Sequence, residues 1–322
     1  MKNKLDLKKI AASVQDYILS LPCTSDLPRK FKISFSACQT ACAKPWLNDL
    51  GFIAMPQNRF KVIAAGSMGP KPSLGIELFD DLAIQDILPL AQASVEFFHL
   101  HGDRQDRRKA RFRHIREKLG DEVFKEQLKE RFEKIKKEKT CPKIKPLESD
   151  QILTLKYKLN LPNGNISPDD ALLLADSAQP FLAQLRINLT HGLEIFADNS
   201  FELPHHLAKL ADNPVITACP GCSTCPNGIV DCYETADLIR RSLTGSDYSA
   251  LSINISGCPN NCAHSAAASI GLIGAKKTFG DVTYSAYRIM LGGGNGKNNK
   301  LAQFSRTLKS QDISNYINNN FT

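Results

Sequence analysis

Six cysteines lie between residues 217 and 262 of this 322-residue chain, and four of them form two spaced pairs. Five residues separate Cys219 from Cys225, and three separate Cys258 from Cys262. Four thiolates from two loops are the ligand set of a [4Fe-4S] cluster, because cysteine sulfur is the usual protein donor to that iron. Glycine and proline between the ligands suit a backbone that turns tightly around an inorganic cube. The spacing therefore favours an iron–sulfur centre on these four cysteines.

Three other interpretations of the cysteines stay open on spacing alone. A structural zinc site usually has two to four residues between the members of each pair, whereas the first pair here has five. Cys219, Cys222 and Cys225 also spell the start of a ferredoxin-like run, but the fourth cysteine expected three residues later is missing, because residue 229 is Ile. Some of the ten cysteines could equally be plain buried structural residues.

The two cysteine loops carry a family resemblance. Residues 217–225 read TACPGCSTC and residues 256–262 read SGCPNNC, which resembles the sulfite and nitrite reductases that couple sirohaem to a [4Fe-4S] cluster. The resemblance implies that the Cys262 sulfur bridges the cluster to the sirohaem iron and that Asn260 approaches the macrocycle. It further implies a six-electron reduction of sulfite to sulfide, or of nitrite to ammonia, with a ferredoxin or a flavoprotein as the electron donor.

A stretch near the N-terminus repeats the second cysteine loop. Residues 36–54 align with residues 256–274 at a constant offset of 220, without a gap. The resembling family is a pseudo-twofold duplication, so an α+β fold is expected, with two sulfite-reductase-type domains and one small ferredoxin-like β-α-β segment. Counting 220 back from Cys219 and Cys225 leaves no cysteine pair opposite Cys38 and Cys42. One cluster is therefore expected, in the second copy, with Cys38 and Cys42 as structural cysteines.

Two lysines follow a proline at the start of the first copy. Alternating apolar residues from Phe31 to Phe35 indicate a strand that places Lys30 and Lys32 on one face. By default this is a solvated strand edge. However, the sequence PRKFK at 28–32 resembles the family segment whose two lysines reach the substrate oxyanion. The resemblance implies that Lys30 and Lys32 bind the substrate and supply protons, and it favours sulfite.

Further basic and glycine-rich segments are candidates for binding the sirohaem carboxylates. The segment that begins GDR at 102–104 resembles a family segment near the macrocycle, which implies carboxylate-binding roles for Arg104, Arg107 and Arg111 through paired guanidinium donors. The alternative is a solvated helix face. Glycine-rich loops can also bind anions through free backbone N–H groups, although they can be ordinary turns. The candidates of this kind are Gly66, Gly292, Gly293 and Gly294.

Composition limits the class of protein. The formal net charge of +8 suits anionic cofactors and substrates, and no nucleic-acid module is recognisable. No run of eighteen apolar residues is present, so no membrane-spanning helix is expected. Cysteines grouped without a signal sequence indicate reduced thiols and a cytoplasmic location.

The order of predicted elements divides the chain into four parts. Helices are expected at 5–20, 86–100 and 230–243, a helix with a break at Gly120 between 103 and 139, strands at 151–160 and 186–196, and a helix from Ser167 to about 178. The predicted parts are a sirohaem-side domain at 1–135, a linker at 136–150, a small ferredoxin-like domain at 151–203 and a cluster domain at 204–322.

The first small domain of the family has no match in this sequence. Either a partner chain supplies it, or the chain is a degenerate relative without catalytic turnover. The main alternative function is a half-size iron–sulfur subunit that transfers electrons without catalytic turnover, and a third is the related oxygenase branch of cobalamin synthesis.

Overall fold

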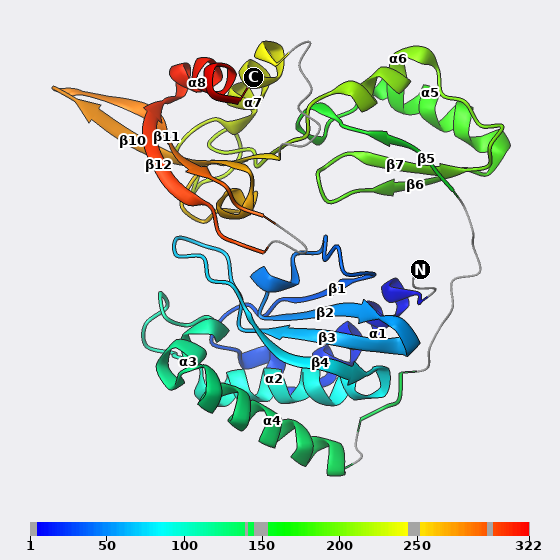
Figure 1. Cartoon of the computed structure of the whole chain (residues 1–322), viewed down its shortest axis with the longest axis vertical. Helices are drawn as coiled ribbons and strands as arrows, with labels where there is room; N and C mark the ends of the chain where they lie inside the picture. The colour runs from blue at the N-terminus through cyan, green and yellow to red at the C-terminus, as the bar shows by residue number, and fades with distance from the viewer. Residues whose placement is uncertain (1–4, 139–140, 145–153, 244–251, 295–298, 322) are drawn as a thin grey trace. The chain divides into compact units, whose positions relative to one another are not determined.

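A computed structural model describes residues 5–138, 141–144, 154–243, 252–294 and 299–321. The chain divides into two compact units, one of residues 1–150 with 295–299 and the other of residues 151–294 with 300–322 (Figure 1). Each unit has its own sheet and core. No helix in the described part of the chain combines the length and the apolar character needed to cross a bilayer.

The first unit contains a four-stranded sheet in the order β1-β2-β3-β4. Strands β1 and β2 pair in parallel, and the other neighbours pair antiparallel. Alternate residues of the central strands, such as Phe52 and Phe60, face a core shared with the helices, while Ile53 and Ile63 face a smaller cluster around Trp46. The elements are α1 (Leu7–Ser20), β1 (Ile33–Ser36), β2 (Leu50–Met55), β3 (Arg59–Ala64), β4 (Ile76–Ala83), α2 (Ile87–His101), α3 (Phe112–Leu119) and α4 (Asp121–Glu138).

The second unit contains two sheets. A five-stranded sheet in the order β12-β11-β10-β9-β8 has parallel pairs β8–β9 and β9–β10. A three-stranded sheet has the order β5-β7-β6. The elements are β5 (Thr154–Leu159), α5 (Pro168–Ala178), β6 (Gln184–Ile187), β7 (Leu193–Ala197), α6 (His205–Ala208), β8 (Ile216–Ala218), α7 (Cys232–Ser242), β9 (Ile253–Ser256), β10 (Ile270–Phe279), β11 (Val282–Leu291), β12 (Gln303–Lys309) and α8 (Ile313–Phe321).

The predicted duplication is confirmed strand by strand. In the first unit Ile33 pairs with Leu50, and in the second unit Ile253 pairs with Ile270, which preserves the offset of 220. For the next strand the offset is 227. Ala64 pairs with Leu50 in the first unit, and Leu291 pairs with Ile270 in the second. Strand β8 has no counterpart in the described part of the first sheet, which has four strands instead of five.

Most predicted helices are present with small shifts at their ends. Helix α5 begins as expected, since the Ser167 side chain accepts a hydrogen bond from the Asp170 backbone N–H. Gly120 separates α3 from α4 with a φ of 82°, a left-handed conformation that favours glycine. Helix α4 continues to Glu138, and the rest of the predicted linker, apart from residues 141–144, lies outside the described residues.

Two strand predictions are wrong in detail. The strand predicted at 186–196 is a hairpin of β6 and β7, because the Asn188 side chain accepts hydrogen bonds from the N–H groups of Thr190 and Gly192 and closes a turn. The β-α-β segment is therefore a β-α-β-β unit with antiparallel pairing. Strand β1 begins at Ile33, so Lys30 and Lys32 precede it rather than lying within it.

Candidate metal centre

Both cysteine loops leave the same edge of the five-stranded sheet. Strands β8 and β9 are parallel neighbours, with Ala218 beside Ile255, and Cys219 follows β8 directly. The N–H of Cys219 donates to the carbonyl of Ile255 at 3.0 Å, and the N–H of Ile229 donates to the carbonyl of Gly257 at 2.8 Å. Because parallel strands end at one edge, the sheet holds the first cysteine loop beside the second.

Two glycines allow the loops to touch. A Cβ on Gly257 would lie 2.6 Å from the Gly221 Cα, a distance that real side chains do not adopt. The N–H of Gly257 points at the Cys219 sulfur, with a nitrogen–sulfur distance of 3.1 Å. An N–H group aimed at a thiolate stabilises its negative charge and, in a cluster, influences the reduction potential.

The four predicted ligands differ in exposure. Cys258 is buried, Cys219 and Cys225 are half-buried, and Cys262 is exposed, as is the non-ligand Cys222. Within the described ranges, no three side chains of Cys, His, Asp or Glu come together closely enough to hold a metal ion. The structure thus brings the two loops together and does not converge the four sulfurs. The all-thiol donor set, the glycine contact and the N–H on Cys219 nevertheless fit an iron–sulfur cluster.

Cys232 is a residue that the sequence reasoning missed. It is fully buried at the start of α7, and its sulfur lies 4.0 Å from the Cys219 sulfur. It also contacts both glycines, since a Cβ on Gly221 or Gly257 would lie 3.1 or 3.2 Å from the Cys232 sulfur. The Cys232 thiol lowers the pKa of Cys219 to about 6, against the effect of burial, and the Gly257 N–H adds to this lowering. The same contact, with burial, raises the pKa of Cys232.

Substitution of Gly257 by alanine tests the contact between the loops. The added methyl group would collide with the Gly221 backbone, so we expect a loss of about 1–3 kcal/mol in the free energy of unfolding and failure to retain iron. Gly280→Ala is the matched control, because it meets no atom within 4 Å and carries only the strain of a φ of 57°. Chemical denaturation and iron content measure both effects. Equal iron retention in the two variants would contradict the account.

Asp49, a residue that the sequence did not single out, contacts two of the predicted basic residues of the first unit. Its side chain is fully buried and pairs with Arg111 at 2.8 Å. The same carboxylate oxygen accepts the backbone N–H of Lys32 at 2.9 Å. Burial raises the pKa of Asp49, while Arg111 and the Lys32 N–H oppose that rise. Asp49 therefore joins two of the predicted residues, Lys32 and Arg111.

The other predicted basic residues lie at the surface. The side chains of Lys30 and Lys32 are exposed. Arg104 pairs with Asp26 at 3.1 Å and also donates to the backbone carbonyls of Asp26 and His99. Arg107 has an exposed side chain, and its carbonyl accepts a hydrogen bond from Arg29. Roles for Lys30, Lys32 and these arginines in binding anions stay predictions.

The N–H groups of the four predicted glycines already have hydrogen-bond partners within the protein. The N–H of Gly66 donates to the carbonyl of Asn48 in the first copy. The N–H of Gly293 donates to the carbonyl of Ala268, the equivalent residue of the second copy. Gly292 donates to Ser269, and Gly294 donates to Lys300. Roles for these glycines in binding the sirohaem carboxylates stay predictions.

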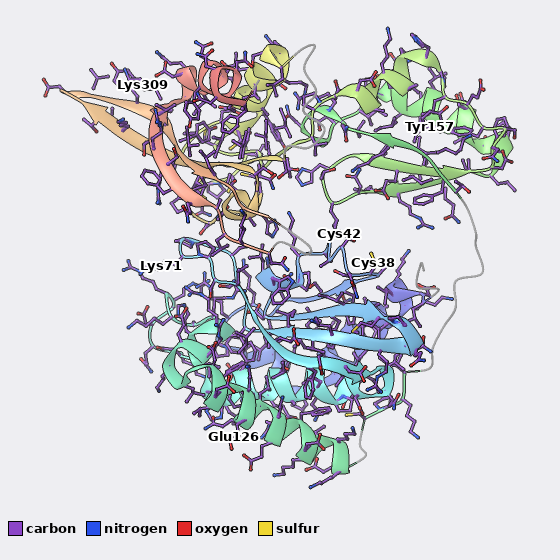
Figure 2. The ribbon with its side chains drawn as sticks, viewed as in Figure 1. Cys38, Cys42, Lys71, Glu126, Tyr157 and Lys309 are labelled. Atoms are coloured by element: carbon purple, nitrogen blue, oxygen red, sulfur yellow. The ribbon has the colours of Figure 1, made fainter. Side chains whose placement is uncertain are left out.

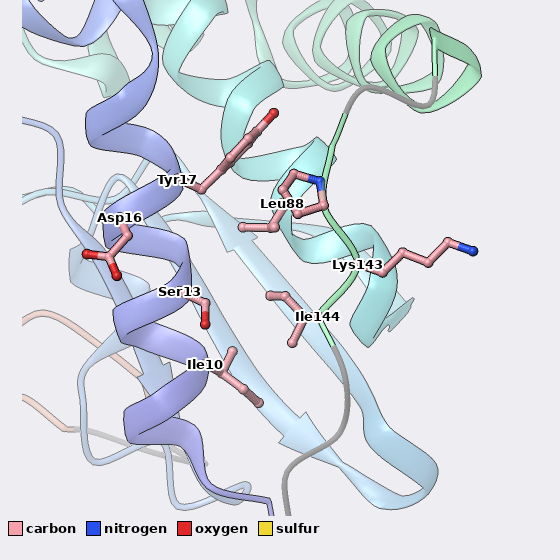
Figure 3. Close-up of a pocket in the computed structure, with 8 residues that line it drawn as sticks. Ile10, Ser13, Asp16, Tyr17, Leu88, Lys143 and Ile144 are labelled. Atoms are coloured by element: carbon pink, nitrogen blue, oxygen red, sulfur yellow. The ribbon is translucent and has the colours of Figure 1, made fainter.

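A hollow of about 500 Å³ lies between α1 and residues 142–144 (Figure 3). It is lined by apolar side chains, among them Ile10, Leu88 and Ile144, with Asp16 and Lys143 beside them. The Tyr17 hydroxyl at this hollow hydrogen-bonds to Gln92 and to the Cys141 sulfur. None of the predicted site residues lines it, so it is separate from the candidate metal centre.

Comparison with known proteins identifies the family. The model of the nitrite and sulphite reductase 4Fe-4S domain matches residues 2–136 and 211–319, more than half of the chain. The chain therefore belongs to the nitrite and sulphite reductase 4Fe-4S domain family, whose cofactors are a [4Fe-4S] cluster and sirohaem. The two matched segments contain the two copies of the duplication.

Individual relatives agree with this assignment. The chain is 27% identical to the hemoprotein beta-component of an NADPH sulfite reductase from Acidithiobacillus ferrooxidans, over 77% of this chain and 51% of that protein. It is 25% identical to an assimilatory ferredoxin-dependent nitrite reductase from Haloferax mediterranei, over 84% and 54% respectively. The chain thus spans about half the length of the curated relatives it matches.

A solved structure shares the fold. The Mycobacterium tuberculosis NirA protein superimposes with a TM-score of 0.75 at 20% identity, covering 96% of this chain and 63% of that one. At that identity the match supports the duplicated α+β architecture alone.

Proposed function

We propose that Cys219, Cys225, Cys258 and Cys262 hold a [4Fe-4S] cluster, and that the chain acts in the six-electron reduction of sulfite to sulfide or of nitrite to ammonia. The observation that carries the proposal is the pair of cysteine loops on neighbouring parallel strands, with the Gly257 N–H 3.1 Å from the Cys219 sulfur. Relatives named as sulfite reductase and as nitrite reductase support the reaction class.

The chain's own residues have three proposed tasks. The cluster loops hold four thiolates in a setting that has an N–H donor on one sulfur. Cys262, exposed at the end of the second loop beside the exposed Asn260, would hold both the cluster and the sirohaem. Lys30 and Lys32, whose side chains are exposed in the first unit, would supply positive charge and protons to an oxyanion. When bound, the cofactors supply the redox chemistry.

The proposal includes an electron donor and a partner chain. Relatives named as ferredoxin-dependent and as NADPH enzymes support a ferredoxin or a flavoprotein donor. The proposed partner chain would complete the sirohaem site. Arg104 and Arg107, exposed in the first unit, are the proposed carboxylate partners of sirohaem together with Arg111. A cytoplasmic location suits thiols that must stay reduced.

The second candidate function is an iron–sulfur subunit that transfers electrons without turnover. Visible spectra of the anaerobically reconstituted chain separate the two. A reductase is expected to show a sirohaem band with an α band in the red, and to reduce sulfite or nitrite with a dye donor. Broad iron–sulfur absorption without either would favour the electron-transfer subunit. The ratio of the rates of sulfite and nitrite reduction gives the preferred substrate. Lys30 and Lys32 favour sulfite.

A further inference from the structure

The loop that follows β1 reproduces the backbone of the second cysteine loop. Residues 36–47 and 256–267 each leave a four-residue strand, turn twice and end in a short helical turn, Pro45–Leu47 in one copy and Ser265–Ala267 in the other. Cys38 and Cys42 occupy the positions of Cys258 and Cys262 in this backbone.

The two loops also agree in their hydrogen bonds and strained residues. The N–H of Ala41 donates to the Cys38 carbonyl at 3.1 Å, as that of Asn261 donates to the Cys258 carbonyl at 3.2 Å. Both turns place a non-glycine residue in the left-handed region, Ala41 with a φ of 50° and Asn261 with a φ of 60°. Such residues are uncommon and persist where the surrounding structure fixes them. The first loop therefore fixes its two cysteines as the second loop does.

The thiols of the first loop are on the surface. Cys38 and Cys42 are both free and exposed (Figure 2), whereas structural cysteines are usually buried. The Cys38 sulfur lies 3.0 Å from the Thr40 hydroxyl, which can donate to a thiolate. An exposed pair of thiols contributes little to packing, so its chemistry is the better explanation of its presence.

A hollow of about 370 Å³ adjoins the loop between the two cysteines. Gln39 and Ala41 line it, together with Trp46 and Met55. The indole N–H of Trp46 is buried and has no hydrogen-bond partner among the described residues. Neither Cys38 nor Cys42 is among the residues that line the hollow, so it flanks the two thiols.

We propose that Cys38 and Cys42 form a two-thiolate site for a soft monovalent metal ion of the Cu(I) type. The inference rests on the proposed function in one respect, that the matching loop presents Cys258 and Cys262 to a single centre. Thiolates select soft metals such as Cu(I). A structural zinc ion requires four ligands, and the other two described cysteines of this unit, Cys23 and Cys141, pack against its hydrophobic core.

Binding involves no change of oxidation state. Two S–H groups lose their protons to solvent, and two sulfur–metal bonds form, so the bound unit of one cation and two thiolates carries one negative charge. The Thr40 hydroxyl near the Cys38 sulfur can stabilise that charge by a hydrogen bond.

The test compares the full chain, loaded anaerobically with its cluster, with the variant Cys38→Ser/Cys42→Ser. Cu(I) is titrated against a chromophoric chelator. The unsubstituted chain is expected to bind one more equivalent of Cu(I) than the double variant. Each single variant is expected to lose at least about tenfold in affinity for that equivalent, because one thiolate cannot complete the site. Cys222→Ser, which removes an exposed thiol of the second unit, is the control and should bind as the unsubstituted chain does.

Equal Cu(I) binding by the unsubstituted chain and the double variant would overturn the proposal, as would full affinity in either single variant. The cluster absorption, recorded on the same samples, reports separately on the proposed function. A chain without a cluster but with the extra Cu(I) equivalent would refute the proposed function and keep this site.

Discussion

Replacing Cys258 by serine is expected to remove the iron–sulfur centre, whereas replacing Cys222 by serine is expected to leave it in place. Cys258 is 8% exposed and follows β9 on the loop that touches Gly221. Cys222 is exposed, and its backbone N–H donates to the Val230 carbonyl, so its side chain is not needed to hold the loop. Because cysteine thiolates hold the iron, we expect iron and labile sulfide to fall about tenfold or more in the first variant, from about four of each per chain.

The pair of variants also decides between the two spacings of the first loop. A ferredoxin-like run would use Cys219, Cys222 and Cys225 together. Loss of iron in Cys222→Ser, with retention in Cys258→Ser, would therefore contradict the assignment of four ligands from two loops. Thermal unfolding of both variants separates loss of the cluster from loss of the fold.

Replacing Arg111 by methionine is expected to destabilise the first unit by about 3–5 kcal/mol, because it leaves a buried carboxylate without its partner. Asp49 is fully buried and Arg111 is 12% exposed in this pair. Without the guanidinium, the effect of burial on the Asp49 pKa is less opposed, so that pKa rises further. A carboxyl group whose pKa is raised by folding stabilises the folded state at pH values below its ordinary pKa of about 3.9. This stabilisation is lost as the pH rises. The loss in free energy of unfolding caused by Arg111→Met should thus be smaller near pH 4 than near pH 8.

Arg104→Met is the matched control for this substitution. The Arg104–Asp26 pair has side chains 39% and 71% exposed, and an exposed pair contributes about 0–1 kcal/mol. Urea unfolding at both pH values measures the two variants. A loss below about 1 kcal/mol for Arg111→Met would show that the buried pair is not structural, and would favour a role for Arg111 in binding sirohaem alone.

The repeated segment made much of the fold predictable from the sequence. An uninterrupted offset of 220 between residues 36–54 and 256–274 requires the same strand and turn in both copies, and the paired registers of Ile33 and Ile253 confirm it. Local signals also held, such as the Ser167 cap of α5. The turn at Asn188 was missed because its apolar flanks, Leu185, Ile187 and Leu193, read as one strand, and the side-chain hydrogen bonds that close the turn leave no periodic signal.

The residues that organise the candidate site were the hardest to predict. The types and spacing of the four cysteines predicted the loops, and β8 and β9 bring those loops together. Cys232 and Asp49 gave no signal, because their roles come from contacts with residues distant in the sequence: Cys232 with Gly257, and Asp49 with Arg111. The backbone carbonyls that accept hydrogen bonds from the predicted glycine N–H groups gave no sequence signal either.

The most direct measurement is an anaerobic crystal structure of the metal-loaded chain. We expect one iron–sulfur cube bound by the sulfurs of Cys219, Cys225, Cys258 and Cys262, with the Gly257 N–H still directed at the Cys219 sulfur. A metal held by Cys222 or Cys232 in place of any of these four, or a zinc ion at the same loops, would contradict it.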